Sequence, residues 1–226
     1  MVDFDKGRTL GLAGSILVLV AIIFWSITDL LGSLLQLVGL ILILISLHTF
    51  SNIYGERIIF RDALLSVLIG YGLPLVALII LLILFIPVGF TVVTVESIPP
   101  GPPGRIEDFF GAQIAGALVV LVLIMVLVLL IAFVVSAYLW YRALNTLYLR
   151  SGEKLFRWAG LSYLAFAVSL IVGVVTAVIL VGLLVILVGV LLGLASWVLL
   201  AIAFYEVKPP QPTIEAEAAP TPAVQV

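Results

Sequence analysis

The sequence predicts an all-α, polytopic transmembrane helical bundle with six spans, and three observations predict it. Of the 226 residues, 65% are hydrophobic and only 10% are charged, whereas a soluble domain carries roughly 25% charged residues. Several stretches contain no Asp, Glu, Lys or Arg and are long enough to cross a hydrocarbon core of about 30 Å as helices. Basic residues also gather between alternate stretches, as they do in loops that share one side of a membrane.

The uncharged stretches set the limits of the spans. They cover residues 9–28, 30–55, 63–95, 109–141 and 158–205. The last one would form a helix of about 72 Å, more than twice the thickness of the hydrocarbon core, so we expect it to turn back near 178–182. The predicted spans are therefore 10–28, 30–49, 63–86, 109–141, 158–178 and 182–205.

The distribution of Lys and Arg predicts the orientation. Six spans place both termini on one side, and that side then collects nine of the ten basic residues, with Arg105 alone on the other. Because basic loops stay on the inner side, both termini are predicted to be cytoplasmic, in a multi-pass protein of the cell membrane. A five-span arrangement would move only Lys208 outside, so the length of 158–205 decides between the two.

Two segments are predicted to lie outside the helices. The extracytoplasmic loop 87–108 contains the Pro- and Gly-rich run Ile98–Arg105, which cannot continue a helix because proline fixes φ and lacks an N–H donor. Residues 208–226 are rich in Pro, Ala and Glu without an apolar face, which predicts a disordered cytoplasmic tail. The transmembrane domain is therefore expected to cover 1–207.

Weak internal similarity suggests a repeated architecture. Residues 52–63 resemble 152–159 with one residue gapped, and residues 8–14 are comparable to 156–160. Both matches involve segments on the predicted inner side. They favour the hypothesis that the chain consists of three tandem helical hairpins in parallel orientation.

Four apolar segments carry a family resemblance. The segments are Leu10–Leu17, Gly39–Leu47, Ile58–Arg61 and Leu155–Leu161. They resemble a mostly archaeal membrane family catalogued as domain of unknown function 996. The resemblance implies a small multi-pass membrane protein and supplies no catalytic residues. Some relatives end in a cysteine-bearing zinc ribbon, which a chain without cysteine cannot form.

Composition argues against several classes of function. The chain has no cysteine and a single histidine, His48, so we expect no cofactor and no metal site of His and Cys ligands. A net charge of −2 does not favour a nucleic-acid partner. No HExxH or GxSxG motif and no paired intramembrane carboxylates occur, so we predict that the protein is not an enzyme. Glu96, Glu107 and Asp108 leave open a cation site in the outer loop.

Small residues share one face of the sixth predicted span. Gly182, Gly189, Gly193 and Ser196 follow spacings of seven, four and three, and the middle pair forms a GxxxG motif. Small faces let helix backbones approach closely in a membrane. We expect this face to pack on the fifth span, with a seam between subunits of a homo- or hetero-oligomer as the alternative.

Polar residues within or beside the spans are few. Gln36 and Gln113 are expected to bridge helices by hydrogen bonds, and Asp29 to cap a helix at a tight turn. His48 is expected to lie near the headgroups. Gly70, Gly72 and Pro74 interrupt the third span and predict a kink, with a substrate site at a broken helix as the alternative.

The inner segment 142–157 carries four basic residues: Arg142, Arg150, Lys154 and Arg157. They are expected to set the topology, and contacts with anionic lipid headgroups or a cytoplasmic partner are the alternatives. The sequence thus favours a non-enzymatic scaffold or accessory subunit that packs with membrane lipids or other membrane proteins. A channel or facilitator for a small neutral solute is the alternative.

Overall fold

The computed structural model describes residues 2–25, 28–83, 106–176 and 180–209. Within these ranges every regular element is a helix, which confirms the predicted all-α class. Six of the described segments are long and apolar enough to span a membrane. The elements are α1 (Val2–Trp25), α2 (Asp29–Tyr54), α3 (Arg57–Val67), the π-helical η1 (Leu68–Gly72) with further helix over 73–83, α5 (Ile106–Ser151), α6 (Lys154–Thr176) and α7 (Leu180–Glu206).

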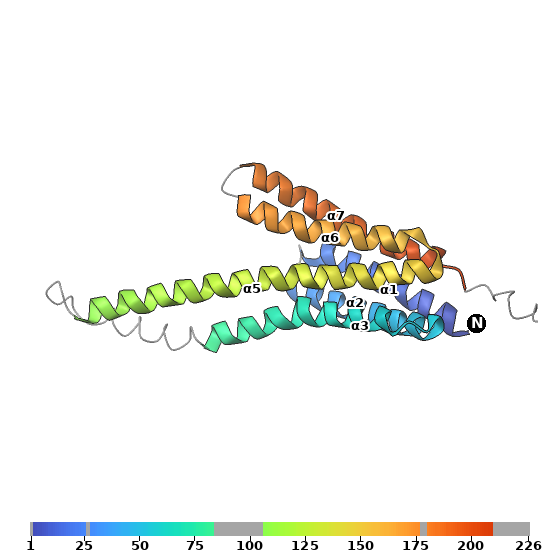
Figure 1. The fold of residues 1–226 in the computed structure, drawn as a ribbon, viewed down its shortest axis with the longest axis horizontal. Coiled ribbons are helices and arrows are strands. Elements are labelled where there is room, and N and C mark those ends of the chain that lie inside the picture. Colours follow the sequence, from blue (N-terminus) through green and yellow to red (C-terminus); the bar gives the residue numbers. More distant parts are fainter. Residues whose placement is uncertain (1, 26–27, 84–105, 177–179, 210–226) are drawn as a thin grey trace, which may run out of the picture.

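The helices form three antiparallel pairs that close into a ring. The pairs are α1 with α2, α3 and η1 with α5, and α6 with α7. Between the pairs, α2 contacts α3, α5 contacts α6, and α7 contacts α1. The amino terminus and the end of α7 lie at the same end of the bundle, which we call the inner end (Figure 1). Each helix thus has two neighbours, and the chain returns to the side on which it starts.

Four phenylalanines join the first and third pairs at the inner end. Phe50 of α2 stacks on Phe204 of α7 with ring centroids 6.0 Å apart. Phe4 and Phe156 meet these rings edge-on, at 5.5 and 5.2 Å. All four side chains are buried. Such aromatic pairs add about 0.5–1.5 kcal/mol each beyond the area that they bury, so this cluster is a strong link between the pairs.

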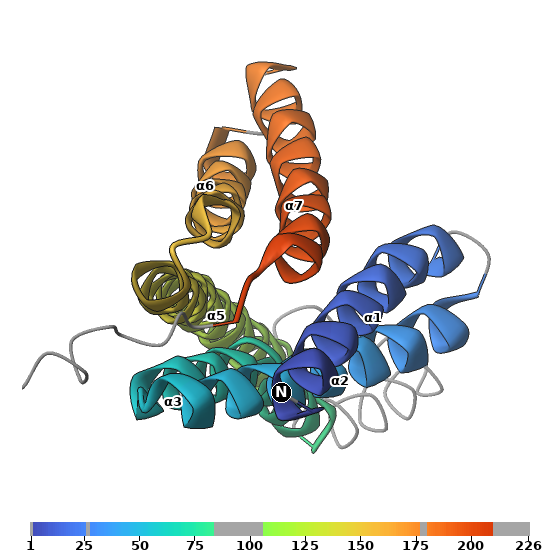
Figure 2. The ribbon, with the colours of Figure 1, turned by 90° about the vertical axis from the view of Figure 1, so that its right-hand side faces the viewer.

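Away from the inner end the pairs diverge (Figures 1 and 2). The α6–α7 pair and the α1–α2 pair point in different directions in Figure 2, and α5 extends well beyond both in Figure 1. Large apolar side chains are exposed on these outer parts, among them Leu30, Leu34 and Leu37 of α2 and Leu183, Leu184 and Leu187 of α7. Each outer half therefore packs mainly on its own partner helix.

One hydrogen bond recurs in all three pairs. A buried serine on the second helix donates its hydroxyl to a backbone carbonyl of the first helix at 2.7–2.8 Å. Four residues further on, each second helix carries a large buried apolar side chain. The three bonds are Ser46 to Gly7, Ser136 to Ser66 and Ser196 to Ala159, and the apolar residues are Phe50, Trp140 and Leu200. This recurrence supports the hypothesis of three tandem hairpins.

Two glycines bring the backbones of α1 and α2 into contact. A Cβ on Gly14 would lie 2.6 Å from the carbonyl oxygen of Gly39, and one on Gly39 would lie 2.8 Å from that of Gly14. Both distances are too short for carbon and oxygen atoms that are not bonded. Only residues without a Cβ allow this crossing, as in other close helix pairs of membrane proteins.

The observed boundaries differ from the predicted ones in α5. This helix has 46 residues and a length of about 69 Å. It continues through Ser151, so most of the predicted inner segment 142–157 is helical and only Gly152 and Glu153 connect α5 to α6. Gly152 has φ +73°, the left-handed conformation that often ends a helix.

Other predicted segments fall partly outside the described residues. The predicted turn near 178–182 overlaps 177–179, and α7 starts at Leu180. Residues 84–105 contain most of the predicted loop 87–108, whereas 106–108 belong to α5. The predicted tail 208–226 lies outside the described residues from 210 onward.

We expect Gly14→Ala to destabilise the protein by about 1–3 kcal/mol, because its methyl group would collide with backbone and force two helices apart. Gly72→Ala is the matched control, since a Cβ there meets no atom within 4 Å. The control should leave stability unchanged or raise it by up to about 1 kcal/mol. Thermal unfolding of both variants in one detergent tests this, and equal midpoints would contradict the contact.

Candidate functional site

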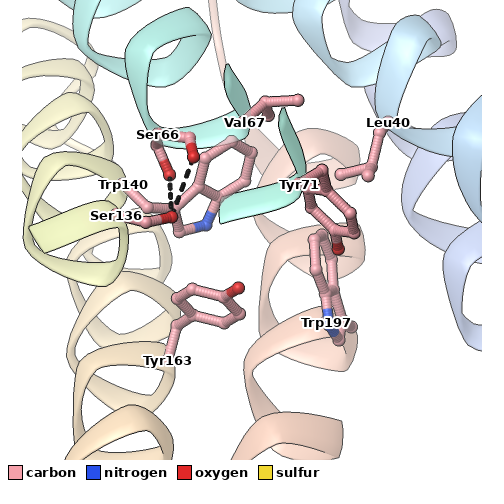
Figure 3. A pocket seen from close by; sticks show the side chains of 8 residues that line it. All are labelled: Leu40, Ser66, Val67, Tyr71, Ser136, Trp140, Tyr163 and Trp197. Carbon is pink, nitrogen blue, oxygen red and sulfur yellow. Dashed lines mark hydrogen bonds between the residues drawn. The ribbon is translucent and has the colours of Figure 1, made fainter. Parts of the chain in front are cut away.

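The centre of the ring holds a small cavity of about 10 Å³ (Figure 3). A cavity of this size admits about one water molecule. Its walls come from α2, α3, η1, α5, α6 and α7, so it lies where all three pairs meet. The lining residues are Leu40, Ser66, Val67, Tyr71, Ser136, Trp140, Tyr163 and Trp197.

Three of the aromatic side chains that line this cavity pack against one another. The ring centroids of Trp140, Tyr163 and Trp197 lie 6.0–6.3 Å from one another, and the three residues come from α5, α6 and α7. Their contacts pack the second and third pairs together. The cavity beside these rings therefore has no space for a solute larger than water.

Polar atoms line one side of the cavity. Ser136 donates to the carbonyl of Ser66 at 2.8 Å, and the two hydroxyl oxygens lie 3.2 Å apart. The indole N–H of Trp140 is buried without an acceptor. No Asp, Glu, Lys, Arg or His lines the cavity. The site can thus hold a hydrogen-bonding molecule of the size of water, and the titratable side chains that line it are those of Tyr71 and Tyr163.

Gln36 bridges two helices beside the cavity. Its amide nitrogen donates to the hydroxyl of Tyr71 at 2.8 Å and links α2 to η1. The sequence predicted a helix-bridging role for Gln36, and the structure supplies its partner. Gln113 lies in α5 among the residues whose side chains are not described.

The predicted interruption of the third span is a π-helical turn. Residues 68–72 form η1 directly before Pro74, which cannot donate to the carbonyl of Gly70. Gly70 faces α5, since a Cβ on it would lie 2.6 Å from the hydroxyl oxygen of Ser136. Gly72 meets nothing within 4 Å. The backbone therefore stays helical here, and of the two glycines only Gly70 faces another helix.

The small-residue face of α7 lies against α6. A Cβ on Gly189 would lie 3.0 Å from the Cβ of Ser169, and one on Gly193 would meet the ring of Phe166 at 3.2 Å. The carbonyl of Gly182 lies 3.1 Å from a Cβ built on Gly173. Ser196 donates to the carbonyl of Ala159 at 2.8 Å. This face packs against α6 inside the third pair.

A buried carboxylate lies between α3 and α5, near the inner end. The side chain of Asp62 is 1% exposed, and its two oxygens lie 3.2 Å from Arg61 Nε and 3.1 Å from Arg142 Nε. Only the contact with Arg61 has the geometry of a hydrogen bond. Asp62 carries no distinctive signal in the sequence, because it directly precedes an uncharged stretch, where a charge that flanks a span is ordinary.

The four basic residues singled out by the sequence have different environments. Arg142 pairs with Asp62, and Arg150 pairs with Glu56, which ties α5 to the link between α2 and α3. The guanidinium of Arg157 lies 5.9 Å from the ring centroid of Tyr148. Lys154, at the start of α6, is exposed and makes no ion pair among the described residues. Three of the four thus have partners within the protein.

An open apolar groove runs between α2 and α3 on the outside of the bundle. Its volume is about 290 Å³, and it is lined by Ile41, Leu44, Ile45, His48, Phe60 and Leu64. The rings of His48 and Phe60 meet edge-on at 4.7 Å, and His48 Nε2 lies 3.3 Å from the side-chain nitrogen of Asn52. His48 therefore marks the end of the groove nearest the inner end. No cluster of three or more acidic or histidine side chains suited to a metal ion occurs among the described residues.

Asp29 is the first residue of α2 and is exposed. Thr28 precedes it as the N-cap residue without a capping hydrogen bond from its side chain. A carboxylate in the first turn is favoured by the helix dipole. Glu107 and Asp108 lie in α5 among side chains that are not described, and Glu96 lies outside the described residues.

The family described as protein of unknown function (DUF996) matches residues 35–191, from the middle of α2 into α7. The matched range is more than half of the chain and includes every residue that lines the central cavity except Trp197. No curated protein and no solved structure matches the chain.

We expect Asp62→Asn to lower the free energy of unfolding by about 1.5–3 kcal/mol, because it removes a buried charge that two guanidinium groups face. Glu56→Gln is the matched control. It removes the ion pair between Glu56 and Arg150, in which both side chains are partly exposed. Exposed pairs contribute at most about 1 kcal/mol. Unfolding of both variants in detergent tests this. An effect of Glu56→Gln as large as that of Asp62→Asn would contradict it.

Proposed function

The chain belongs to the DUF996 family, and we propose that it is a non-enzymatic scaffold or accessory subunit of the cell membrane. In this proposal the inner end holds the molecule together, and the diverging outer halves bind helices of other membrane proteins. Lipid covers the faces that no partner occupies. Both termini are placed on the cytoplasmic side, following the distribution of basic residues.

The observation that carries this proposal is the contrast between the two ends of the bundle. At the inner end and around the central cavity, aromatic contacts join the pairs, and the buried Asp62 links α3 to α5 within the second pair. In the outer halves, apolar side chains on several faces of α2 and α7 remain exposed. Protruding hairpins of this kind offer long apolar surfaces to neighbouring helices, which associate in membranes through close packing.

The closed interior argues for a scaffold over a channel. The central cavity has room for about one water, and three of the aromatic rings that line it pack against one another. A conducting path would need these rings to separate. No charged residue lines the cavity, so it lacks the buried carboxylate that proton- or sodium-coupled transporters commonly use.

A facilitator for a small neutral solute is the second candidate, and one observation favours it. The cavity lies beside η1, and π-helical turns often occur at functional sites. Flux of a neutral solute in vesicles distinguishes the two candidates. Flux that is abolished by Ser136→Leu, which fills the cavity, but not by Gly72→Leu, which faces open space, would favour the facilitator.

The chain has no cysteine, so single cysteines can be labelled without background. We expect Leu184→Cys carrying benzophenone to cross-link to a discrete protein partner in native membranes, because Leu184 is exposed on the outer half of α7. Leu149→Cys is the control, since Leu149 is equally accessible but lies at the inner end of α5. The readout is the mass of the adducts. Adducts with lipid alone at Leu184, or the same protein adduct at both positions, would contradict the proposal.

A further inference from the structure

The groove between α2 and α3 has the shape of a site for a hydrocarbon chain. Its volume of about 290 Å³ far exceeds that of the central cavity, and all of its lining residues except His48 are apolar. Ile41 and Ile45 are exposed, so the groove opens to the outside of the bundle. It lies within two of the segments apolar enough to span a membrane, where hydrocarbon is the surrounding solvent.

Polar groups gather at one end of this groove only. His48 lies at that end, with Asn52 one turn further along α2. On α3, Arg57 lies one turn before Phe60 on the same helix stripe. Because α2 runs toward the inner end and α3 runs away from it, all three residues share the inner edge of the groove. The site is therefore apolar along its length and polar at its interfacial end.

Arg57 differs from the other arginines in having no partner. Among the described residues, five of six arginines contact an acidic side chain or an aromatic ring, whereas Arg57 is exposed and makes neither contact. Its five N–H donors are thus free to bind an anion. The partnered arginines are Arg8 with Tyr205, Arg61 and Arg142 with Asp62, Arg150 with Glu56, and Arg157 with Tyr148.

We propose that this groove binds one anionic phospholipid, with a hydrocarbon chain along Ile41, Ile45 and Leu64 and the phosphate at Arg57. His48 and Asn52 add N–H donors at the same edge. The inference deepens the proposed function, since it names the lipid that covers one face of the scaffold. It rests on the membrane placement of α2 and α3, but not on the existence of a protein partner.

The arrangement favours a lipid over a soluble anion. A free phosphate would use Arg57 alone and would gain nothing from the groove. A phospholipid fills the apolar groove with its chain and meets the guanidinium with its phosphate, which Arg binds in a planar, bidentate manner. Each basic residue near an anionic membrane surface contributes about 1 kcal/mol, so the preference for an anionic headgroup depends measurably on Arg57.

Native mass spectrometry of the full chain in detergent tests the headgroup contact. The probes are dioleoyl phosphatidylglycerol and dioleoyl phosphatidylcholine, which have the same chains. We expect one retained phosphatidylglycerol, bound about fivefold more tightly than phosphatidylcholine, which is the equivalent of roughly 1 kcal/mol. Arg57→Gln should abolish this preference and Arg57→Lys should keep most of it. Lys6→Gln, which removes an exposed charge from the same end of the bundle, should leave it unchanged.

A second pair of variants tests the groove itself. Ile45→Trp should fill the groove and reduce the binding of both lipids at least fivefold. Ile16→Trp is the control, because Ile16 is exposed on α1. Its neighbour Gly14 lies against Ile43 of α2, so Ile16 and Ile45 lie at similar depths along the bundle. Circular dichroism and gel filtration establish that each variant is folded, and a variant that fails this check is replaced by Leu44→Trp or Ile16→Phe.

Three results would overturn the inference. The first is equal binding of the two lipids by the unaltered chain. The second is the same loss of preference in Arg57→Gln and Lys6→Gln. The third is displacement of phosphatidylglycerol by millimolar inorganic phosphate, which would identify a site for the soluble anion instead. None of these results affects cross-linking at Leu184, so a failure here is distinguishable from a failure of the proposed scaffold function.

Discussion

The aromatic contacts at the inner end are the interaction on which the rest of the structure depends. Within a membrane, burial of apolar surface supplies little drive for helices to associate, because lipid chains are as apolar as the side chains. Close packing and polar contacts must replace it. Each pair has a serine–carbonyl bond and small residues for this purpose, but the pairs meet one another through rings: Phe50 with Phe204, and Trp140 with Trp197 and Tyr163.

This concentration of contacts at one end leaves the outer halves without neighbours. The small face of α7 packs against α6. The exposed surfaces are instead rich in Leu, Ile and Val. Such surfaces suit lipid chains and other helices, which is why a scaffold accounts for the molecule better than a pore. The groove between α2 and α3 adds one place where the identity of the lipid matters.

The sequence predicted the class and the number of spans because the absence of charge over about 20 residues is a direct signal of hydrocarbon. It predicted the end of the fourth span less well, since Arg142 and Arg150 resembled loop residues although both lie on α5 and pair with Asp62 and Glu56. Charge marks the edge of the hydrocarbon core and not the end of a helix. The central cavity escaped prediction because its four aromatic residues come from four different elements, η1, α5, α6 and α7. The recurrent serines Ser46, Ser136 and Ser196 could have been found by aligning the second helices.

The central claim is that the pairs join at the inner end and diverge outward, and electron–electron double resonance in lipid nanodiscs tests it most directly. Spin labels at Thr9 and Glu206 report on α1 and α7 at the inner end, where Arg8 and Tyr205 are in contact. Labels at Phe24 and Leu184 report on the outer ends of the same two helices. The account predicts a clearly longer distance for the outer pair. Equal distances, or a shorter outer distance, would show helices packed along their whole length and would contradict it.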